Sequence, residues 1–467
     1  LKAVDIADQL PSIATCESAE YVNAVFAPPS TPEAAAEIEG LRQQLTRAAT
    51  LETAGELPRA RALASEVALR ASELSYRPLE AQARLLDGRA QMELGEARPA
   101  DTAALLNQAL AAATAADLPD IAAESLARGL FVQALDGHAD DALRWATVAE
   151  AHLERAVERD RLRGLLRNNL GAIYRMRGDD ERARELLEEA LTARVAAHGA
   201  QHVEVARTLI NLSLVSESDG ARVDAMRRAL EIFEAQLGPS HPETLDKRIG
   251  LSVHLSSPSE AAELLERACA QFSHEHPDST EIRQRCLIFL AHHRAETGDT
   301  ARAAGTLRTA LQLTAARADA APIDALGRAT VEALASYYEG DYAAGVAAIE
   351  GPLRDAGEAD APWWIERRLG EAAYALGLNL LALDRRDEAV GPLERAVAAM
   401  SRAREAAPRV EYYQREANAQ WALAQALGRS PETRARADEL AAAAARWYER
   451  AGPEYASRLA AVRSRRE

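Results

Sequence analysis

The sequence predicts an all-α protein built as an array of about ten helical hairpins, and three observations support this prediction. Ala, Leu, Glu and Arg are abundant, whereas aromatic residues make up only 4% of the chain, a composition that favours helices over strands. A mostly small residue followed by a small or aliphatic one recurs about every 40 residues. Glycines at turn positions follow the same period. A chain of 467 residues is too long for one compact domain, and the even repetition indicates stacked repeats.

The first marker lies at the end of the apolar stripe of one predicted helix in each repeat. Its spacing stays near 40 residues along almost the whole chain. The marker begins at Val67, Ala109, Ala149, Ala190, Ala229, Ala268, Ala310, Pro352, Ala396 and Ala444.

The second marker is a glycine that follows one helical stretch and precedes the next. Glycine supplies the left-handed backbone conformation that commonly ends a helix. The marker glycines are Gly55, Gly95, Gly137, Gly178, Gly220, Gly298, Gly340 and Gly428. Ser-Ser-Pro near position 257 and Asp-Arg-Arg-Asp near position 384 replace it in two repeats.

Helix starts can also be read from the sequence. Ser257 and Ser240 are each followed three residues later by Glu, the spacing of a capping box, and we expect both serines to cap helices. Pro32 and Pro431 follow Thr31 and Ser430, and we expect these prolines at first helical positions, where the missing N–H costs nothing.

Within one repeat, small residues alternate with large apolar residues at fixed positions. Small residues at the eighth and twentieth positions should let the two helices of a hairpin approach closely. We therefore expect Gly171 to lie at a closest approach. The clearest repeat contains Leu170, Gly171, Tyr174, Gly178, Ala183, Leu187, Ala190 and Leu191, and Leu376, Gly377, Ala389, Leu393 and Ala396 repeat the pattern.

These positions resemble the tetratricopeptide repeat, although the period here is longer than the usual 34 residues. The joints His198–His202 and Leu237–Glu243, and the helix segment Asn168-Asn169-Leu170-Gly171, are similar to those of kinesin-light-chain repeats. The resemblance implies a right-handed superhelical solenoid of about ten tetratricopeptide-type hairpins. We expect a leader with a short helix over residues 1–36, the repeat array over 37–450 and a capping helix over 451–467.

The leader has a resemblance of its own. Thr15-Cys16-Glu17-Ser18, Val25-Phe26-Ala27-Pro28-Pro29 and Thr31-Pro32-Glu33 are similar to the segment that joins kinase to repeats in serine/threonine protein kinases of myxobacterial type. The chain does not begin with Met, so we expect it to be part of a longer protein. The resemblance implies a kinase domain in the missing N-terminal portion.

Charge and cysteine content exclude some classes of function. The net charge of −17 disfavours a nucleic-acid binder, which needs a basic face. Three cysteines cannot form a disulfide framework, which favours a reducing, cytoplasmic compartment. No run of 18 apolar residues is present, so we expect no membrane insertion.

Catalytic motifs are absent from the sequence. There is no Gly-rich phosphate loop, His-Arg-Asp or Asp-Phe-Gly motif, Walker loop, Gly-x-Ser-x-Gly or His-Glu-x-x-His. We expect no enzymatic activity and no cofactor in this part of the protein.

Histidines and cysteines raise the question of zinc. A mixed site could form from Cys269 and Cys286 with His274, His276, His292 and His293. The alternative is that histidines at the joints, such as His198 and His202, cap helices while both cysteines lie in the core. We favour the second interpretation and predict no metal site.

Three surface features have competing interpretations. Arg182, Arg184 and Arg194 alternate with Glu185–Glu189 and are expected to form solvated helix pairs. The tail over Arg446–Glu467 either docks an acidic surface or, as we favour, caps the array. Trp363-Trp364 at a helix start either anchors a partner or, as we favour, packs over the preceding joint.

The first helix of each hairpin should line the concave side, where polar side chains can hydrogen-bond an extended peptide. No dense Lys/Arg cluster occurs there, which disfavours a clamp for a C-terminal carboxylate. The predicted partner-binding residues are Asn168, Arg175, Arg207, Asn211, Arg285, His292 and Tyr374.

These observations predict a protein–protein interaction scaffold that binds a peptide or protein in its concave groove. The leader resemblance implies the regulatory or substrate-docking region of a bacterial signalling protein such as a serine/threonine kinase. One alternative is the ligand-sensing arm of an ATP-dependent transcription regulator. Another is a repeat region attached to a transferase or peptidase.

Overall fold

The computed structural model describes residues 31–94, 97–216, 218–277, 279–313, 322–356, 363–406, 410–428 and 431–464. These residues form helices and connecting turns, and no strand occurs among them, so the all-α prediction is confirmed. The chain divides into two compact units, unit 1 (Leu1–Gln236) and unit 2 (Leu237–Glu467). The sequence markers did not predict this division.

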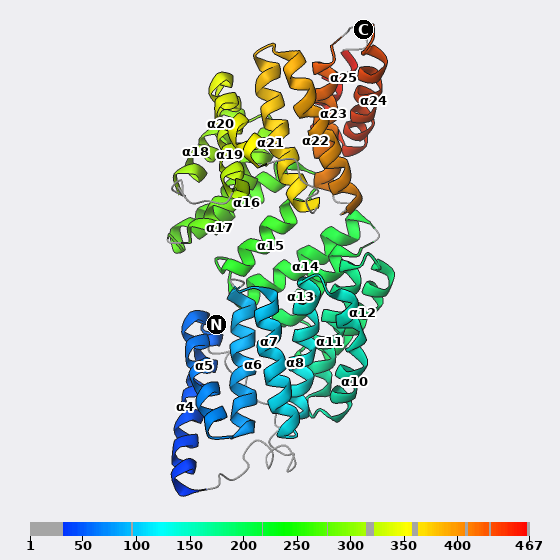
Figure 1. Ribbon diagram of the computed structural model, residues 1–467. Helices are drawn as coiled ribbons and strands as arrows, with labels where there is room; N and C mark the ends of the chain where they lie inside the picture. Colours follow the sequence, from blue (N-terminus) through cyan, green and yellow to red (C-terminus); the bar gives the residue numbers. More distant parts are fainter. Residues whose placement is uncertain are drawn as a thin grey trace. The chain divides into compact units, whose positions relative to one another are not determined.

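Unit 1 consists of five consecutive hairpins among its described residues (Figure 1). The second helix of the third hairpin is broken at Trp145, so that hairpin has three helices. The helices are α4 (Pro32–Thr53), α5 (Leu57–Glu73), α6 (Arg77–Leu94), α7 (Pro99–Ala115), α8 (Pro119–Leu135), α9 (Ala139–Arg144), α10 (Ala146–Arg155), α11 (Arg159–Met176), α12 (Asp180–His198), α13 (Val203–Leu214) and α14 (Asp219–Leu237).

Unit 2 continues the same plan with five hairpins among its described residues, followed by a short C-terminal segment. The described hairpins of the two units therefore number ten, as predicted. The helices are α15 (Pro242–Ser252), α16 (Pro258–Glu275), α17 (Thr280–Glu296), α18 (Thr300–Leu313), α19 (Pro322–Glu339), α20 (Tyr342–Asp355), α21 (Trp363–Ala382), α22 (Arg386–Ala406), α23 (Val410–Ala426), α24 (Arg434–Ala451), the 3-10 helix η1 (Pro453–Tyr455) and α25 (Ala456–Ser464).

The small–aliphatic marker identifies the second helix of every hairpin. Each marker position lies in α5, α7, α10, α12, α14, α16, α18, α20, α22 or α24. The marker alanines at 109, 149, 190, 229, 310, 396 and 444 have no exposed surface. The period in the sequence is thus the period at which a second helix buries its stripe between neighbouring first helices.

The glycine marker is confirmed in most repeats. Positive φ angles occur at Gly55, Gly137, Gly178, Gly298, Gly340 and Gly428, and Asp384 adopts one where glycine is missing. Gly95 lies outside the described residues. The turn prediction is wrong for Gly220, which lies inside α14, because the Ser218 hydroxyl already accepts the Ala221 N–H and starts the helix earlier.

Two of the predicted helix starts are confirmed. The N–H of Glu260 donates to the Ser257 hydroxyl at 3.1 Å, and Thr31 caps α4 in the same way. Two are wrong. His241 caps α15 because the hydroxyl of Ser240 accepts a hydrogen bond from Gln271 instead.

The other wrong start concerns α24, which begins at Arg434 and not at Pro431. Pro431 lies in a turn, and the Thr433 hydroxyl donates to the Leu427 carbonyl across that turn.

Two pairs of helices approach closely where a glycine faces a leucine. A Cβ placed on Gly171 would lie 2.7 Å from Leu187 Cγ, and one on Gly377 would lie 2.5 Å from Leu393 Cγ. Both leucines are fully buried. The predicted close approach at Gly171 is therefore confirmed, since even a methyl group would meet the facing helix.

Cysteine pairing departs from the sequence expectation. Cys269 of α16 and Cys286 of α17 form a disulfide inside the core of unit 2. The core position was predicted, but the bond was not. Cys16 lies outside the described residues, as does most of the leader.

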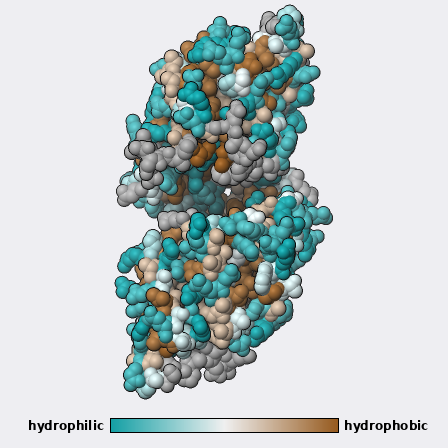
Figure 2. All heavy atoms as spheres, viewed as in Figure 1, coloured by the Kyte–Doolittle hydropathy of each residue, from teal (hydrophilic) through white to brown (hydrophobic). Residues whose placement is uncertain are grey.

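The exterior is largely polar. Figure 2 shows hydrophilic residues over most of the face in view, with apolar residues in smaller groups between them. Within the described ranges, no helix combines the length and the apolar character needed to cross a membrane.

Candidate functional site

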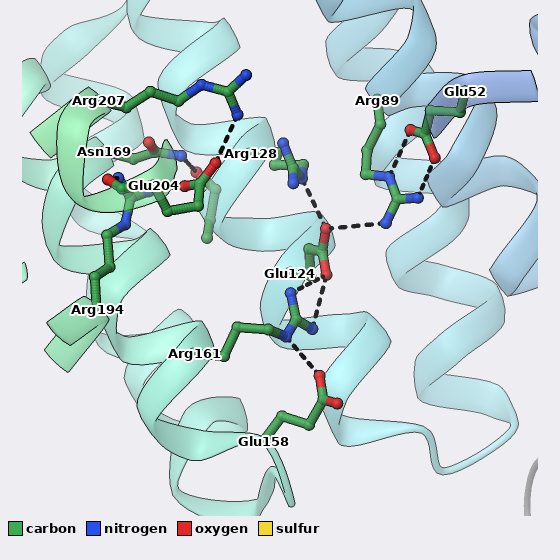
Figure 3. A network of polar contacts seen from close by, with 11 residues as sticks. Glu52, Arg89, Glu124, Arg128, Glu158, Arg161, Asn169, Arg194, Glu204 and Arg207 are labelled. Atoms are coloured by element: carbon green, nitrogen blue, oxygen red, sulfur yellow. Dashed lines mark hydrogen bonds and ion pairs between the residues drawn. The ribbon is translucent and has the colours of Figure 1, made fainter. Parts of the chain in front are cut away.

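Charged and amide side chains of the first helices α4, α6, α8, α11 and α13, and of the second helix α12, lie close together in unit 1 (Figure 3). We call this set the unit 1 network. It consists of Glu52, Arg89, Glu124, Arg128, Glu158, Arg161, Asn169, Arg194, Glu204 and Arg207. Its hydrogen bonds and ion pairs connect neighbouring hairpins, so the repeats hold its members in fixed positions.

Glu124 of α8 is the centre of this network. Its carboxylate lies 2.9 Å from Arg128 Nε, 3.1 Å from Arg161 Nη1 and 3.6 Å from Arg89 Nη1. Burial alone would raise the pKa of Glu124, but the three guanidinium groups outweigh it and lower that pKa well below its usual range. Glu124 therefore stays ionised although it is only 3% exposed.

The outer members of the network bind the guanidinium groups that Glu124 shares. Arg89 donates through Nε to Glu52 of the first hairpin at 2.9 Å. Arg161 donates through Nε to Glu158 at 2.5 Å. Arg128 bonds only to Glu124 among the described residues, through Nε, which leaves its outer nitrogen edge available to a ligand.

A second group lies where α12 meets α13. Arg194 donates to the Glu204 carbonyl at 2.7 Å and to the Thr208 hydroxyl at 2.8 Å, and it pairs with the Glu204 carboxylate. Burial would raise the pKa of Glu204, but Arg194 and Arg207 lower it to about 2. Gly164 makes room for this arginine, because a Cβ there would lie 2.7 Å from Arg194 Cγ.

Asparagines connect three first helices in sequence. Asn169 donates to the Ala127 carbonyl of α8 at 2.9 Å, and Asn168 donates to Asn169 at 3.2 Å. Asn211 of α13 donates to Asn168 Oδ1 at 2.9 Å. Asn168 and Asn169 are buried, so their amides fix the spacing of α8, α11 and α13.

Glu93, in the last turn of α6, shows that these helices surround a common space. Glu93 is exposed, but partial loss of solvent around it raises its pKa, as does Glu52, while Arg207, Arg128 and Arg89 lower it. Arg207 lies three hairpins beyond Glu93 in the sequence, yet it interacts electrostatically with that carboxylate. These interactions indicate that side chains of α6, α8 and α13 face the same side of unit 1, the side that the sequence predicts to be concave.

The predicted partner-binding residues divide between the two units. In unit 1, Asn168 and Asn211 are bonded to each other. Arg207 lies one helical turn before Asn211 and pairs with Glu204. Arg175 is half-buried in the last turn of α11.

In unit 2, Arg285 pairs with Asp246 of α15 on a half-exposed surface. His292 and Tyr374 lie deeper, on α17 and α21. Burial, together with Arg415 and Arg458, lowers the pKa of His292 to about 3. Burial raises the pKa of Tyr374 well above its usual range.

Two residues of the network, Glu124 and Arg194, were not predicted from the sequence. Arg194 was expected in a solvated pair, but it is 3% exposed because Glu204 and Thr208 of the next hairpin bind it. For Glu124 a signal exists in the sequence, since it stands within the apolar stretch Ile121–Leu130 of α8. A lone acid in such a stretch indicates a buried, paired carboxylate.

Of the two histidines at this joint, His202 is a helix cap, as predicted, whereas the described residues show no capping bond of His198. His202 Nδ1 accepts the Glu204 N–H at 3.1 Å, and the His198 ring stacks on His202. No group of three or more potential metal ligands occurs in the part of the chain that the structure describes.

Comparisons with known proteins place the repeat family on part of the chain. Residues 160–221 match the tetratricopeptide repeat. A crystal structure of nearly identical TPR-like repeats from a Podosopora anserina putative kinesin light chain is similar at 19% identity and a TM-score of 0.36, covering 40% of this chain and 93% of that chain. No curated protein matches this chain. Tetratricopeptide repeats generally mediate protein–protein interaction.

Proposed function

We propose that this protein is an interaction scaffold that binds a peptide or protein partner on the concave face of unit 1. The observation that carries the proposal is the unit 1 network, in which Glu124 binds arginines of α6, α8 and α11 and Asn211 of α13 is bonded to α11, since these contacts join side chains from several repeats. An extended peptide on such a face meets hydrogen-bonding groups from each hairpin in turn.

Arg128, Arg207 and Asn211 are the proposed contact residues. The outer edge of Arg128 is available, the Arg207 side chain is 42% exposed, and Asn211 is half-buried beside them. Asn168 supports this surface from below, because its amide is bonded on both sides. Because acids in the network already neutralise these arginines, directional hydrogen bonds and not net charge should select the partner.

Selection from a library of random peptides displayed on phage tests this proposal. Peptides selected on the full chain should bind the Arg128→Gln/Arg207→Gln variant at least about tenfold more weakly, as expected for lost charge-assisted bonds. Arg182→Gln is the matched control, because Arg182 forms an exposed pair with Glu185 on the second helix α12. An equal loss of peptide affinity in both variants, or no loss in either, would refute the proposal that partners bind this face.

A finer proposal is that this scaffold docks a regulator or substrate for a serine/threonine kinase in the same bacterial signalling protein. Its support is the resemblance of the leader, which lies almost wholly outside the described residues. The upstream coding sequence tests it, since catalytic-loop motifs would support the kinase and a Walker loop would support the transcription-regulator alternative instead.

A further inference from the structure

The C-terminal segment of unit 2 returns to hairpins that occur much earlier in the sequence. Gly452 has a φ of 105° and turns the chain from α24 into η1. The Glu454 carboxylate accepts hydrogen bonds from the Ser257 hydroxyl at 2.6 Å and the Ser259 N–H at 3.3 Å. These partners lie at the start of α16, 197 and 195 residues away. The segment therefore bridges the two ends of unit 2.

Arg458 of α25 forms the deepest of these contacts. Its Nη1 lies 2.9 Å from Glu296 Oε2 of α17 and donates to Asn418 Oδ1 of α23 at 2.7 Å. Asn418 also accepts the Tyr448 hydroxyl at 2.7 Å and donates to Glu296 at 3.3 Å. We call Glu296, Asn418 and Tyr448 the Arg458 site.

Aromatic side chains from further first helices surround this site. Tyr338 of α19 and Tyr374 of α21 are half-buried, and both interact electrostatically with the guanidinium of Arg458. His292 of α17 interacts with it as well. The first helices α17 and α23 thus bind this cation directly, and tyrosines of α19 and α21 interact with it electrostatically.

The helix that supplies this cation is held by little else. Only Val462 of the nine residues of α25 is buried, and Leu459 is half-buried against α24 and η1. A hollow remains between α24 and α25, lined by Ala442, Ala445, Arg446, Glu449, Val462 and Arg463. Tyr455 of η1, just before α25, is buried against Trp447 and Tyr448, so the segment is held by this ring and Val462 on one side and by the polar contacts of Arg458 on the other.

The Arg458 site needs a cation from outside the first helices. The Glu296 side chain is only 6% exposed, and a buried carboxylate without a partner is strongly unfavourable. Arg415 of α23 cannot serve, because it is bonded to Glu371. A guanidinium suits the site better than an ammonium, since it is planar, can bridge two oxygens and packs against phenol rings.

We propose that the Arg458 site recognises the arginine side chain of a partner peptide, and that α25 is an intramolecular occupant which this peptide displaces. The site lies in unit 2 and is independent of the concave face of unit 1. Because α25 itself shows what fits, the partner segment is a short helix with one arginine and a small apolar face.

A labelled peptide with the sequence of residues 453–464 is the probe for this proposal. It should bind the full-length Arg458→Ala variant at least about tenfold more tightly than the wild type, in which Arg458 already occupies the site. The same peptide with Ala at the position of Arg458 should not bind. Arg463 provides the matched control in chain and peptide, because its pair with Glu449 is exposed.

Two further measurements keep the proposal open to refutation. The double variant Arg458→Ala/Glu296→Gln leaves no unpaired buried charge and should fold even if the single variant does not, and it should lose the preference for the arginine peptide. Retained preference in this variant would overturn the site. Propylguanidinium should raise the thermal stability of the Arg458→Ala variant far less than the peptide does. An equal rise would mean that the ligand is a small guanidine, and it would refute the proposal of a partner peptide.

Discussion

The contact between Gly171 and Leu187 offers a direct test of how the hairpins are held together. Replacing Gly171 with Ala adds one methyl group, whose carbon would lie 2.7 Å from Leu187 Cγ and 3.1 Å from the Ala183 carbonyl oxygen. The backbone oxygen cannot rotate away, and Leu187 has no exposed surface toward which to move. The α11–α12 hairpin must therefore open slightly.

The expected cost follows from two opposing effects. Overpacking a core costs about 1–3 kcal/mol, whereas replacing glycine with alanine inside a helix gains about 0.5–1 kcal/mol. We expect Gly171→Ala to destabilise the hairpin by about 1–2 kcal/mol. Gly40→Ala in α4 is the matched control, because no atom lies within 4 Å of the added Cβ and only the favourable effect remains.

Hydrogen exchange followed by mass spectrometry is the appropriate assay, since it reports each helix separately. A loss of about 1–2 kcal/mol should raise exchange in α11 and α12 by about five- to thirtyfold, with smaller effects in α8 and α13. Gly40→Ala should slow exchange in α4. If Gly171→Ala leaves exchange unchanged or raises it evenly across all of unit 1, the reasoning from local contact is wrong.

Three further predictions concern charge and covalent bonds. Burial lowers the pKa of His292 and His293 to about 3, so the unfolded chain takes up protons at a higher pH than the folded chain. Unit 2 should therefore lose up to about 1.4 kcal/mol of stability per histidine for each pH unit between about 6.5 and about 3. Denaturant melts at a series of pH values check this. Reducing the bond between Cys269 and Cys286, 17 residues apart, should cost about 3 kcal/mol, seen as faster exchange in α16 and α17 when reductant is added. Glu124→Gln leaves three arginines without their shared acid and should cost about 3–5 kcal/mol, measured as faster exchange in α6, α8 and α11.

Local features of the sequence were enough to predict the hairpins. A second helix is recognised by its buried alanine, and a turn by a glycine with positive φ, and both depend on residues within one repeat. The errors at Gly220 and Pro431 had local causes, in Ser218 and in the turn that Thr433 closes onto Leu427, whereas the error at Ser240 arose from a distant residue. Ser240 had the sequence of a helix cap, but Gln271 of the next helix engages its hydroxyl, and His241 caps the helix instead.

The charged sites could not be predicted in the same way, because their members belong to different repeats. Whether Arg194 meets water or Glu204 depends on the angle between consecutive hairpins, which no single repeat encodes. The same holds for Arg458, whose partner Glu296 is 162 residues earlier in the sequence. Asn168 was identified as polar and inward-facing, but its bonds to Asn169 on its own helix and to Asn211 on α13 became visible only in the folded chain.

The two units use one architecture with different patterns of coupling. In a simple repeat array each hairpin contacts only its neighbours, and the bonds from Glu52 to Arg89 and from Asn168 to Asn211 in unit 1 follow this rule, although Glu93 and Arg207 interact electrostatically over a longer span. Unit 2 does not, because α25 connects the last hairpin to α17. A contact between distant repeats makes their opening interdependent, so unit 2 should open as a whole where unit 1 opens locally. Displacing α25 would weaken this coupling and leave the Asn418–Glu296 bond between α23 and α17, so binding at the Arg458 site would change the rigidity of unit 2.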